Sequence, residues 1–117
     1  MSSNKILGNI GESKSCNYLL KSGYELLFRN FRCRYGEIDI VAKNGNIISF
    51  IEVKTRSGTL YGNPEESIDN QKKIHIKNTA NYYIQQAGLE DYEISFDVIS
   101  IIADGRKFKL KHLKNCF

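Results

Sequence analysis

The residues numbered 36–55, GEIDIVAKNGNIISFIEVKT, decide the fold. Two runs rich in β-branched residues, 37–42 and 47–54, flank the short polar segment KNGN at 43–46. An Asn-Gly pair between alternating apolar runs is the strongest short-range signal for a β-hairpin. We therefore predict a hairpin in which Asn44 and Gly45 form the two-residue turn.

This turn predicts which residues of the hairpin share a face. Asp39 lies opposite Phe50 and Glu37 lies opposite Glu52. Because side chains alternate along a strand, one face carries Glu37, Asp39, Glu52 and Lys54, and the other carries Ile38, Ile40, Ile51 and Val53. Asp39 and Glu52 become diagonal neighbours, with their backbones roughly 7–8 Å apart.

Acids gathered on one strand face repel one another unless a cation compensates them. Mg²⁺ and Mn²⁺ prefer carboxylate and water oxygens, and Lys54 lies beside the acids to stabilise charge on a phosphate. The alternative is a solvated hairpin end with surface ion pairs. Val41, Ile48 and Phe50 belong to the same face, so we expect that face to be covered.

The rest of the chain predicts a single domain, 1–117, of the α/β class. A helix is expected over 5–22, a strand over 24–31, and a second helix from Pro64 to about 87, with a break near Asn70 left open. Strands follow at 93–102 and 107–113. This order favours a mixed sheet with helices packed on its faces. The core-facing residues expected on the second helix are Ile68, Ile76, Ala80 and Tyr83.

Composition excludes several classes of protein. The chain has 117 residues, 17 Lys+Arg against 13 Asp+Glu and a formal charge of +4, which is typical of a folded soluble domain. The longest apolar run, 47–53, is too short to span a bilayer, and the first residues do not resemble a secretory leader. We expect a cytoplasmic protein without a membrane partner. Three cysteines and two histidines lack the spacing of a zinc site, so the cysteines are expected to be reduced.

The basic residues are clustered, but charge alone leaves their role open. Clusters that could contact a phosphate backbone or simply face solvent are Lys54 with Arg56, Lys72 with Lys73 and Lys77, and Arg106 with Lys107, Lys109, Lys111 and Lys114.

A family resemblance rests on further motifs. Asp39 followed by Glu52-Val53-Lys54 resembles the D…(D/E)-x-K signature of restriction-endonuclease-like nucleases. The full string resembles the bacterial YraN family over essentially the whole chain; its parts are Gly11-Glu12, Tyr18-Leu19, Asn30-Phe31-Arg32, Gly36–Asp39, Phe50–Arg56, Tyr61-Gly62, Lys72, Phe96–Val98 and Asn115–Phe117. Ser95 departs from the family pattern, which has arginine there, and Cys116 replaces its alanine.

The resemblance implies a restriction-endonuclease-like three-layer fold, similar to Holliday junction resolvases, with a mixed sheet between helices. It also implies that Asp39 and Glu52 bind Mg²⁺ or Mn²⁺, that Lys54 is catalytic and that Glu12 is an additional acid. On the same basis Arg56 and Lys72 are candidates for contacting nucleic acid. For Glu12 a polar helix position, and for Lys72 a solvated lysine, remain alternatives; Arg56 could instead pair with Glu37 or Glu66.

Two functions follow as hypotheses. The first is a metal-dependent endonuclease acting on DNA, with branched or damaged DNA as candidate substrates and a homodimer as a candidate assembly. The alternative is a nucleic-acid-binding module of nuclease fold without efficient catalysis. A structural protein with a vestigial acid cluster is a third option, which intact Asp39, Glu52 and Lys54 make less favourable.

Overall fold

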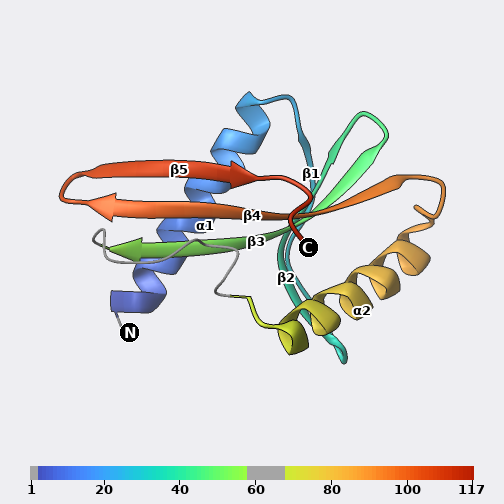
Figure 1. Cartoon of the computed structure of the whole chain (residues 1–117). Helices are drawn as coiled ribbons and strands as arrows, with labels where there is room; N and C mark the ends of the chain where they lie inside the picture. The colour runs from blue at the N-terminus through green and yellow to red at the C-terminus, as the bar shows by residue number, and fades with distance from the viewer. Residues whose placement is uncertain (1–2, 58–67) are drawn as a thin grey trace.

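The computed structural model describes residues 3–57 and 68–117 (Figure 1). In chain order the elements are α1 (Ser3–Lys21), β1 (Glu25–Cys33), β2 (Gly36–Asn44), β3 (Ile47–Ser57), α2 (Asn70–Ala87), β4 (Glu93–Asp104) and β5 (Lys107–Leu113). This order of helices and strands confirms the prediction. In the described part of the chain, neither helix is long and apolar enough to cross a membrane.

The strands form a five-stranded mixed sheet in sequence order. Neighbouring strands are antiparallel except β3 and β4, which are parallel. Parallel neighbours need a long crossover, and α2 lies in it. The mixed α/β sheet predicted from the sequence is therefore confirmed.

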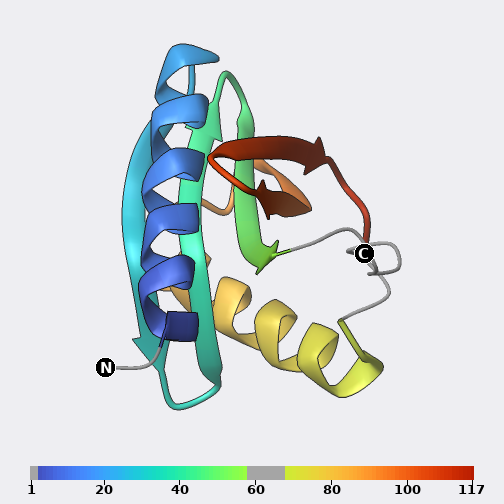
Figure 2. The same cartoon turned by 90° about the vertical axis from the view of Figure 1, so that its left-hand side faces the viewer.

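The helices cover opposite faces of the sheet, so the fold has three layers (Figures 1 and 2). On the α1 side, the buried cluster is Cys16, Leu19, Tyr24, Ile40, Ala42, Ile51, Ile99 and Ile101. On the α2 side it is Ile38, Val41, Ile48, Phe50, Ile68, Ile76, Ala80, Tyr83, Ile84 and Val98. The four core positions predicted for the second helix segment are all buried.

The hairpin forms as predicted, but its register differs by two residues. Asn44 pairs with Ile47, so the turn consists of Gly45 and Asn46. Gly45 has φ 61, and glycine is favoured where the first turn residue needs a positive φ. Phe50 consequently pairs with Val41, and the predicted pairing of Asp39 with Phe50 is wrong.

The alternation of β2 breaks at Asp39. Ile40 packs in the α1-side cluster, whereas Ile38 packs in the α2-side cluster. The prediction that Ile38 and Ile40 share a face is therefore wrong. The regular β2–β3 ladder ends at the pair Ile40 and Ile51, directly beside this change.

The second helix begins later than its first predicted residue. Asp69 is the N-cap, in an extended conformation, and its carboxylate accepts a hydrogen bond from the Lys72 N–H. The helix therefore begins at Asn70, where the sequence left a break open; Pro64 lies outside the described residues. Gly88 ends it in the left-handed conformation, with φ 68.

Candidate active site

The candidate site lies where β2 and β3 stop pairing. Asp39 comes directly before Ile40 on β2, and Glu52 comes directly after Ile51 on β3. Oδ2 of Asp39 accepts a hydrogen bond from the Val53 N–H at 2.8 Å. This hydrogen bond to the main chain lies beyond the last regular pair of the ladder. It holds the Asp39 carboxylate beside Glu52.

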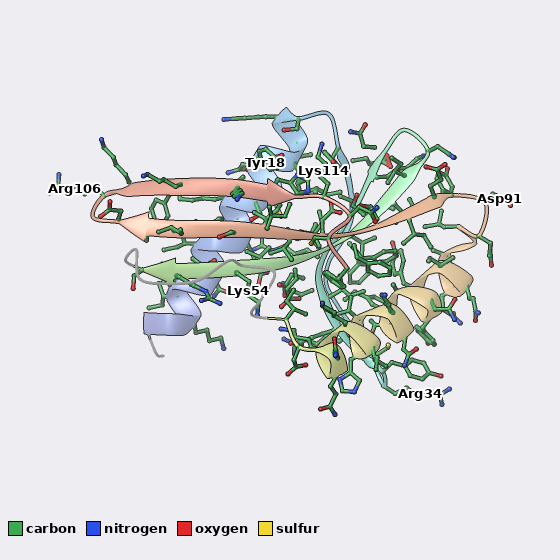
Figure 3. All side chains as sticks on the ribbon, in the orientation of Figure 1. Tyr18, Arg34, Lys54, Asp91, Arg106 and Lys114 are labelled. Carbon is green, nitrogen blue, oxygen red and sulfur yellow. The ribbon has the colours of Figure 1, made fainter. Side chains whose placement is uncertain are left out.

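Two lysines approach the same oxygen of Glu52. Nζ of Lys72, in the first turn of α2, donates to Oε1 at 2.7 Å, and Nζ of Lys54, on β3, lies 3.8 Å from it. The side chain of Glu52 is only 11% exposed. The first turn of α2 thereby brings a cation to a carboxylate that the sheet partly buries. Figure 3 shows Lys54 on β3, near the middle of the molecule.

The electrostatics of this cluster are unusual for surface groups. Burial, and next the negative charge of Glu52, raise the pKa of Asp39 from 3.8 to about 7. Burial and then the charge of Lys72 lower the pKa of Lys54. Burial opposes the charged form of Lys72 too, but the hydrogen bond to Glu52 raises its pKa overall. Perturbed groups gathered in one place are typical of functional sites.

Helix α1 brings a third acid toward the pair. Gly11 packs so closely on β3 that an added Cβ would lie 1.8 Å from Oγ1 of Thr55. The next residue, Glu12, is near enough for its charge to contribute to the raised pKa of Asp39. Oε1 of Glu12 is buried and accepts no hydrogen bond from a described residue, although Arg29 Nε lies 3.5 Å away.

The donor set fits a hard divalent cation. Mg²⁺ is commonly held by one or two carboxylates, with water and substrate phosphate completing its shell. Asp39 and Glu52 supply two carboxylates, and the unsatisfied Oε1 of Glu12 is a further oxygen nearby. Within residues 3–57 and 68–117, no three His, Cys, Asp or Glu side chains form a metal cluster by themselves. The described residues therefore fit a cation that is held by two carboxylates and whose coordination shell is completed by other oxygens.

Other candidate residues lie in different surroundings. Glu37 was expected to join the acid patch, but its carboxylate pairs with Arg32 Nε at 3.1 Å and both side chains are largely exposed. Glu37 therefore pairs with Arg32 of β1 instead of joining Asp39 and Glu52, although it lines a groove together with Lys72. Arg56 is partly buried on β3, two residues beyond Lys54.

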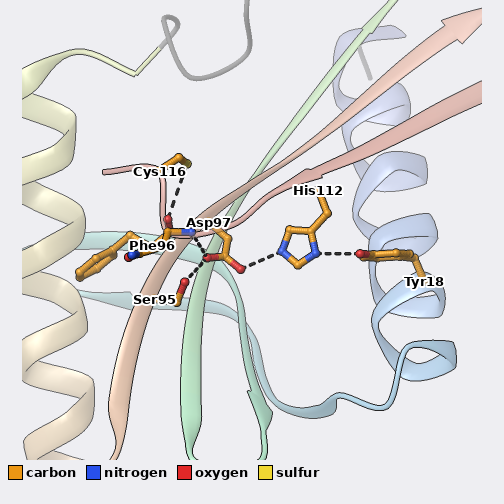
Figure 4. A network of polar contacts seen from close by, with 7 residues as sticks. Tyr18, Ser95, Phe96, Asp97, His112 and Cys116 are labelled. Carbon is orange, nitrogen blue, oxygen red and sulfur yellow. Dashed lines mark hydrogen bonds and ion pairs between the residues drawn. The ribbon is translucent and has the colours of Figure 1, made fainter.

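The structure contains a buried polar network that was not predicted from the sequence (Figure 4). His112 Nε2 lies 2.7 Å from Oδ2 of Asp97, and its Nδ1 lies 2.8 Å from the Tyr18 hydroxyl of α1. Both His112 and Asp97 are almost completely buried. Burial would raise the pKa of Asp97, but hydrogen bonds from His112, the Asn115 N–H and Ser95 hold it below its usual value. The family motif around Asp97 was a signal, but it did not reveal the partners.

The fold and this cluster define a three-layer α/β protein with a carboxylate pair and two lysines where two strands separate. The model of the uncharacterised protein family UPF0102 matches residues 11–101. The chain belongs to that family, as the YraN resemblance implied.

Two relatives in sequence agree with this assignment. A UPF0102 protein of Clostridium tetani is 48% identical over 116 residues, covering 97% of this chain and 95% of the relative. One from Caldicellulosiruptor saccharolyticus is 42% identical over 113 residues, covering 95% and 96%. Among solved structures, the Holliday junction resolvase Hjc of Archaeoglobus fulgidus has a TM-score of 0.43 and 23% identity, covering 87% of this chain and 71% of that one.

Proposed function

We propose that the protein is a Mg²⁺- or Mn²⁺-dependent endonuclease that hydrolyses phosphodiester bonds in DNA. The observation that carries the proposal is the pair Asp39 and Glu52, joined to Lys54 and Lys72 at the end of the β2–β3 ladder. An ionised acid pair is costly there without a cation, because burial and Glu52 already favour the protonated form of Asp39.

Each side chain has a separate role in the proposed reaction. Asp39 and Glu52 hold the cation, which when bound supplies positive charge at the scissile phosphate and lowers the pKa of water. The hydrogen bond from the Val53 N–H keeps Asp39 in place as the substrate enters. Glu12 adds a carboxylate oxygen from α1.

Lys54 is proposed to stabilise the extra negative charge that the phosphate acquires as a water oxygen bonds to phosphorus. Its lowered pKa also suits it to transfer a proton. A base accepts the proton of the attacking water as the water oxygen bonds to phosphorus. The bond from phosphorus to the leaving oxygen then breaks, and the leaving oxygen gains a proton. Lys72 is proposed to bind the phosphate from the α2 side, where its ammonium already meets Glu52.

A second candidate function is nucleic-acid binding without efficient cleavage. The observation in its favour is the direct 2.7 Å contact of Lys72 with Glu52, because an ammonium at a carboxylate opposes the binding of a second cation. In this alternative the two lysines bind phosphate and the acids only position them.

The test compares wild type with Glu52→Gln and Asp39→Asn on linear, nicked and four-way DNA, in Mn²⁺ and in EDTA. We expect cleavage by wild type in Mn²⁺ alone, and a loss of at least about 100-fold in each variant, equivalent to about 2.7 kcal/mol. Cleavage that persists in Glu52→Gln contradicts the assigned site. Tight, salt-sensitive binding without cleavage in any metal favours the second function.

A further inference from the structure

The register of the sheet aligns basic residues with the candidate site. Lys54 on β3 pairs with Ser100 on β4, and Ser100 pairs with Lys111 on β5. One step farther from Glu52, the aligned residues are Arg56, Ile102 and Lys109. Aligned residues of neighbouring strands project from the same face of a sheet. Lys111 and Lys109 therefore share the face of Lys54.

Packing identifies this face independently of the register. On β5, Leu110 packs in the α1-side cluster, and Nζ of Lys14 from α1 lies 4.3 Å from the centre of the Phe108 ring. His112 also contacts α1, through the Tyr18 hydroxyl. The even-numbered residues of β5 thus face α1. Lys107, Lys109 and Lys111 alternate with them and face the other way, on the α2 side.

The part of this face on β5 is exposed. Lys109 and Lys111 are both exposed, and β5 is the edge of the sheet. Helix α2 lies on this same face but packs chiefly against β2, away from the β5 edge (Figure 1). We follow the aligned rows of β3, β4 and β5 away from Glu52. Among their described residues the next acid is Asp104, which pairs with Lys107 at the end of β4. A positive strip thus runs from the carboxylate pair to the edge of the sheet.

We propose that Lys109 and Lys111 bind the phosphate backbone of nucleic acid next to the phosphate held at Asp39 and Glu52. This inference rests on the proposed function for the position of the scissile phosphate. Two strand spacings separate Lys54 from Lys111, roughly 10 Å between backbones. That span corresponds to about three nucleotides, since each adds 3.4 Å along a duplex. The nucleic acid therefore crosses β4 and reaches β5, and the strip fixes its direction across the site.

The opposite face offers a matched control. A groove of about 430 Å³ lies between α1 and β5, and the residues that line it are Lys14, Asn17, Tyr18, Lys21, Ser22, Phe108 and Leu110. Lys14 and Lys21 are exposed and belong to α1. Changing these two lysines alters the net charge as much as changing Lys109 and Lys111, but on the face of the sheet opposite to Lys54.

The experiment measures binding of a fluorescein-labelled DNA duplex by anisotropy, in EDTA, from 50 to 300 mM KCl (about twofold below to threefold above 0.1 M). The proteins are wild type, Lys109→Gln/Lys111→Gln and Lys14→Gln/Lys21→Gln. Each phosphate contact contributes about 0.9 to the slope of log affinity against log salt. We expect the first double variant to lose about 1.8 from the slope, and on the order of 10- to 60-fold in affinity at 0.1 M salt. The α1 variant should keep the wild-type slope.

Three outcomes overturn the inference: no binding by wild type, equal losses in both double variants, or a loss confined to the α1 variant. Circular dichroism confirms that each variant is folded, and single Gln variants replace a double variant that is not. Cleavage in Mn²⁺ is scored separately. If wild type binds through Lys109 and Lys111 but never cleaves, the nuclease function fails while this binding surface stands.

Discussion

Lys72 approaches Glu52 more closely than Lys54 does, at 2.7 Å against 3.8 Å, although Lys54 is only two residues from Glu52 in the chain. The contact joins the first turn of α2 to the end of the β2–β3 hairpin. Helix α2 is therefore part of the site, and its position controls the charge around Glu52.

Replacing Lys72 should increase the affinity for a divalent cation. In Lys72→Ala, Glu52 loses the ammonium that contacts Oε1, so the negative charge offered to a cation increases. We expect Mn²⁺, titrated without DNA by calorimetry, to bind at least about fivefold more tightly than to wild type. Lys73→Ala, which alters the neighbouring lysine, is the control. Weaker Mn²⁺ binding in Lys72→Ala argues that the cation is held elsewhere.

The raised pKa of Asp39 predicts how stability depends on pH. Between its ordinary value of 3.8 and about 7, the folded protein keeps a proton that the unfolded chain has lost. The free energy of unfolding therefore decreases as pH rises through that window. Asp39→Asn removes this dependence, so urea midpoints in EDTA should favour the variant at pH 8 and converge with wild type near pH 4. Asp91→Asn, at an exposed position, is the control, and its urea midpoints should equal those of wild type at every pH. If the midpoints of Asp39→Asn also equal those of wild type at every pH, the pKa of Asp39 is not raised in the folded protein.

The buried network should be a major source of stability. Asp97→Asn leaves His112 without its anionic partner in a buried position, and we expect a loss of about 3 kcal/mol in the free energy of unfolding. Because hydrogen bonds hold the pKa of Asp97 low, their contribution in wild type is present above pH 4 and is lost as pH falls below its usual value. Tyr18→Phe removes one hydrogen bond and should cost only about 1 kcal/mol. Similar losses in both variants would contradict a charged Asp97.

Two glycines of α1 should respond oppositely to the same substitution. In Gly11→Ala the new methyl group overlaps Thr55, so α1 must move away from β3 and stability should fall by about 1–3 kcal/mol. In Gly8→Ala no atom lies within 4 Å of the new Cβ, and helix propensity should add about 0.5–1 kcal/mol. Urea unfolding measures both. If Gly11→Ala displaces Glu12, it should also weaken Mn²⁺ binding, whereas Gly8→Ala should not.

Much of the fold could be predicted because its signals are local. The hairpin, the edge strand at Lys107–Leu113 and the alternation of its lysines follow from neighbouring residues. The hairpin register was wrong because the positive φ falls on Gly45 as the first turn residue. A shift of two residues still leaves Asp39 and Glu52 at neighbouring positions, one residue beyond the pair Ile40 and Ile51.

The remaining features depend on contacts that are distant in the chain. The face of Ile38 could not be predicted, because the sequence alternates regularly through Asp39 whereas the strand changes face there. The contact of Lys72 with Glu52 requires the position of α2 after a crossover. The network of Tyr18, His112 and Asp97 joins residues up to 94 positions apart.

The parallel pairing of β3 and β4 also bears on the order of folding. Strands β1 to β3 form a meander of antiparallel neighbours, whereas β4 can pair with β3 only after the crossover closes. Local pairings form before distant ones because loop closure costs entropy. We therefore expect the carboxylates of Asp39 and Glu52 to come together before Lys72 arrives. We expect the repulsion between these two carboxylates to slow the folding of the meander, and the docking of α2 to relieve that repulsion. The charges of the site therefore favour closure of the crossover.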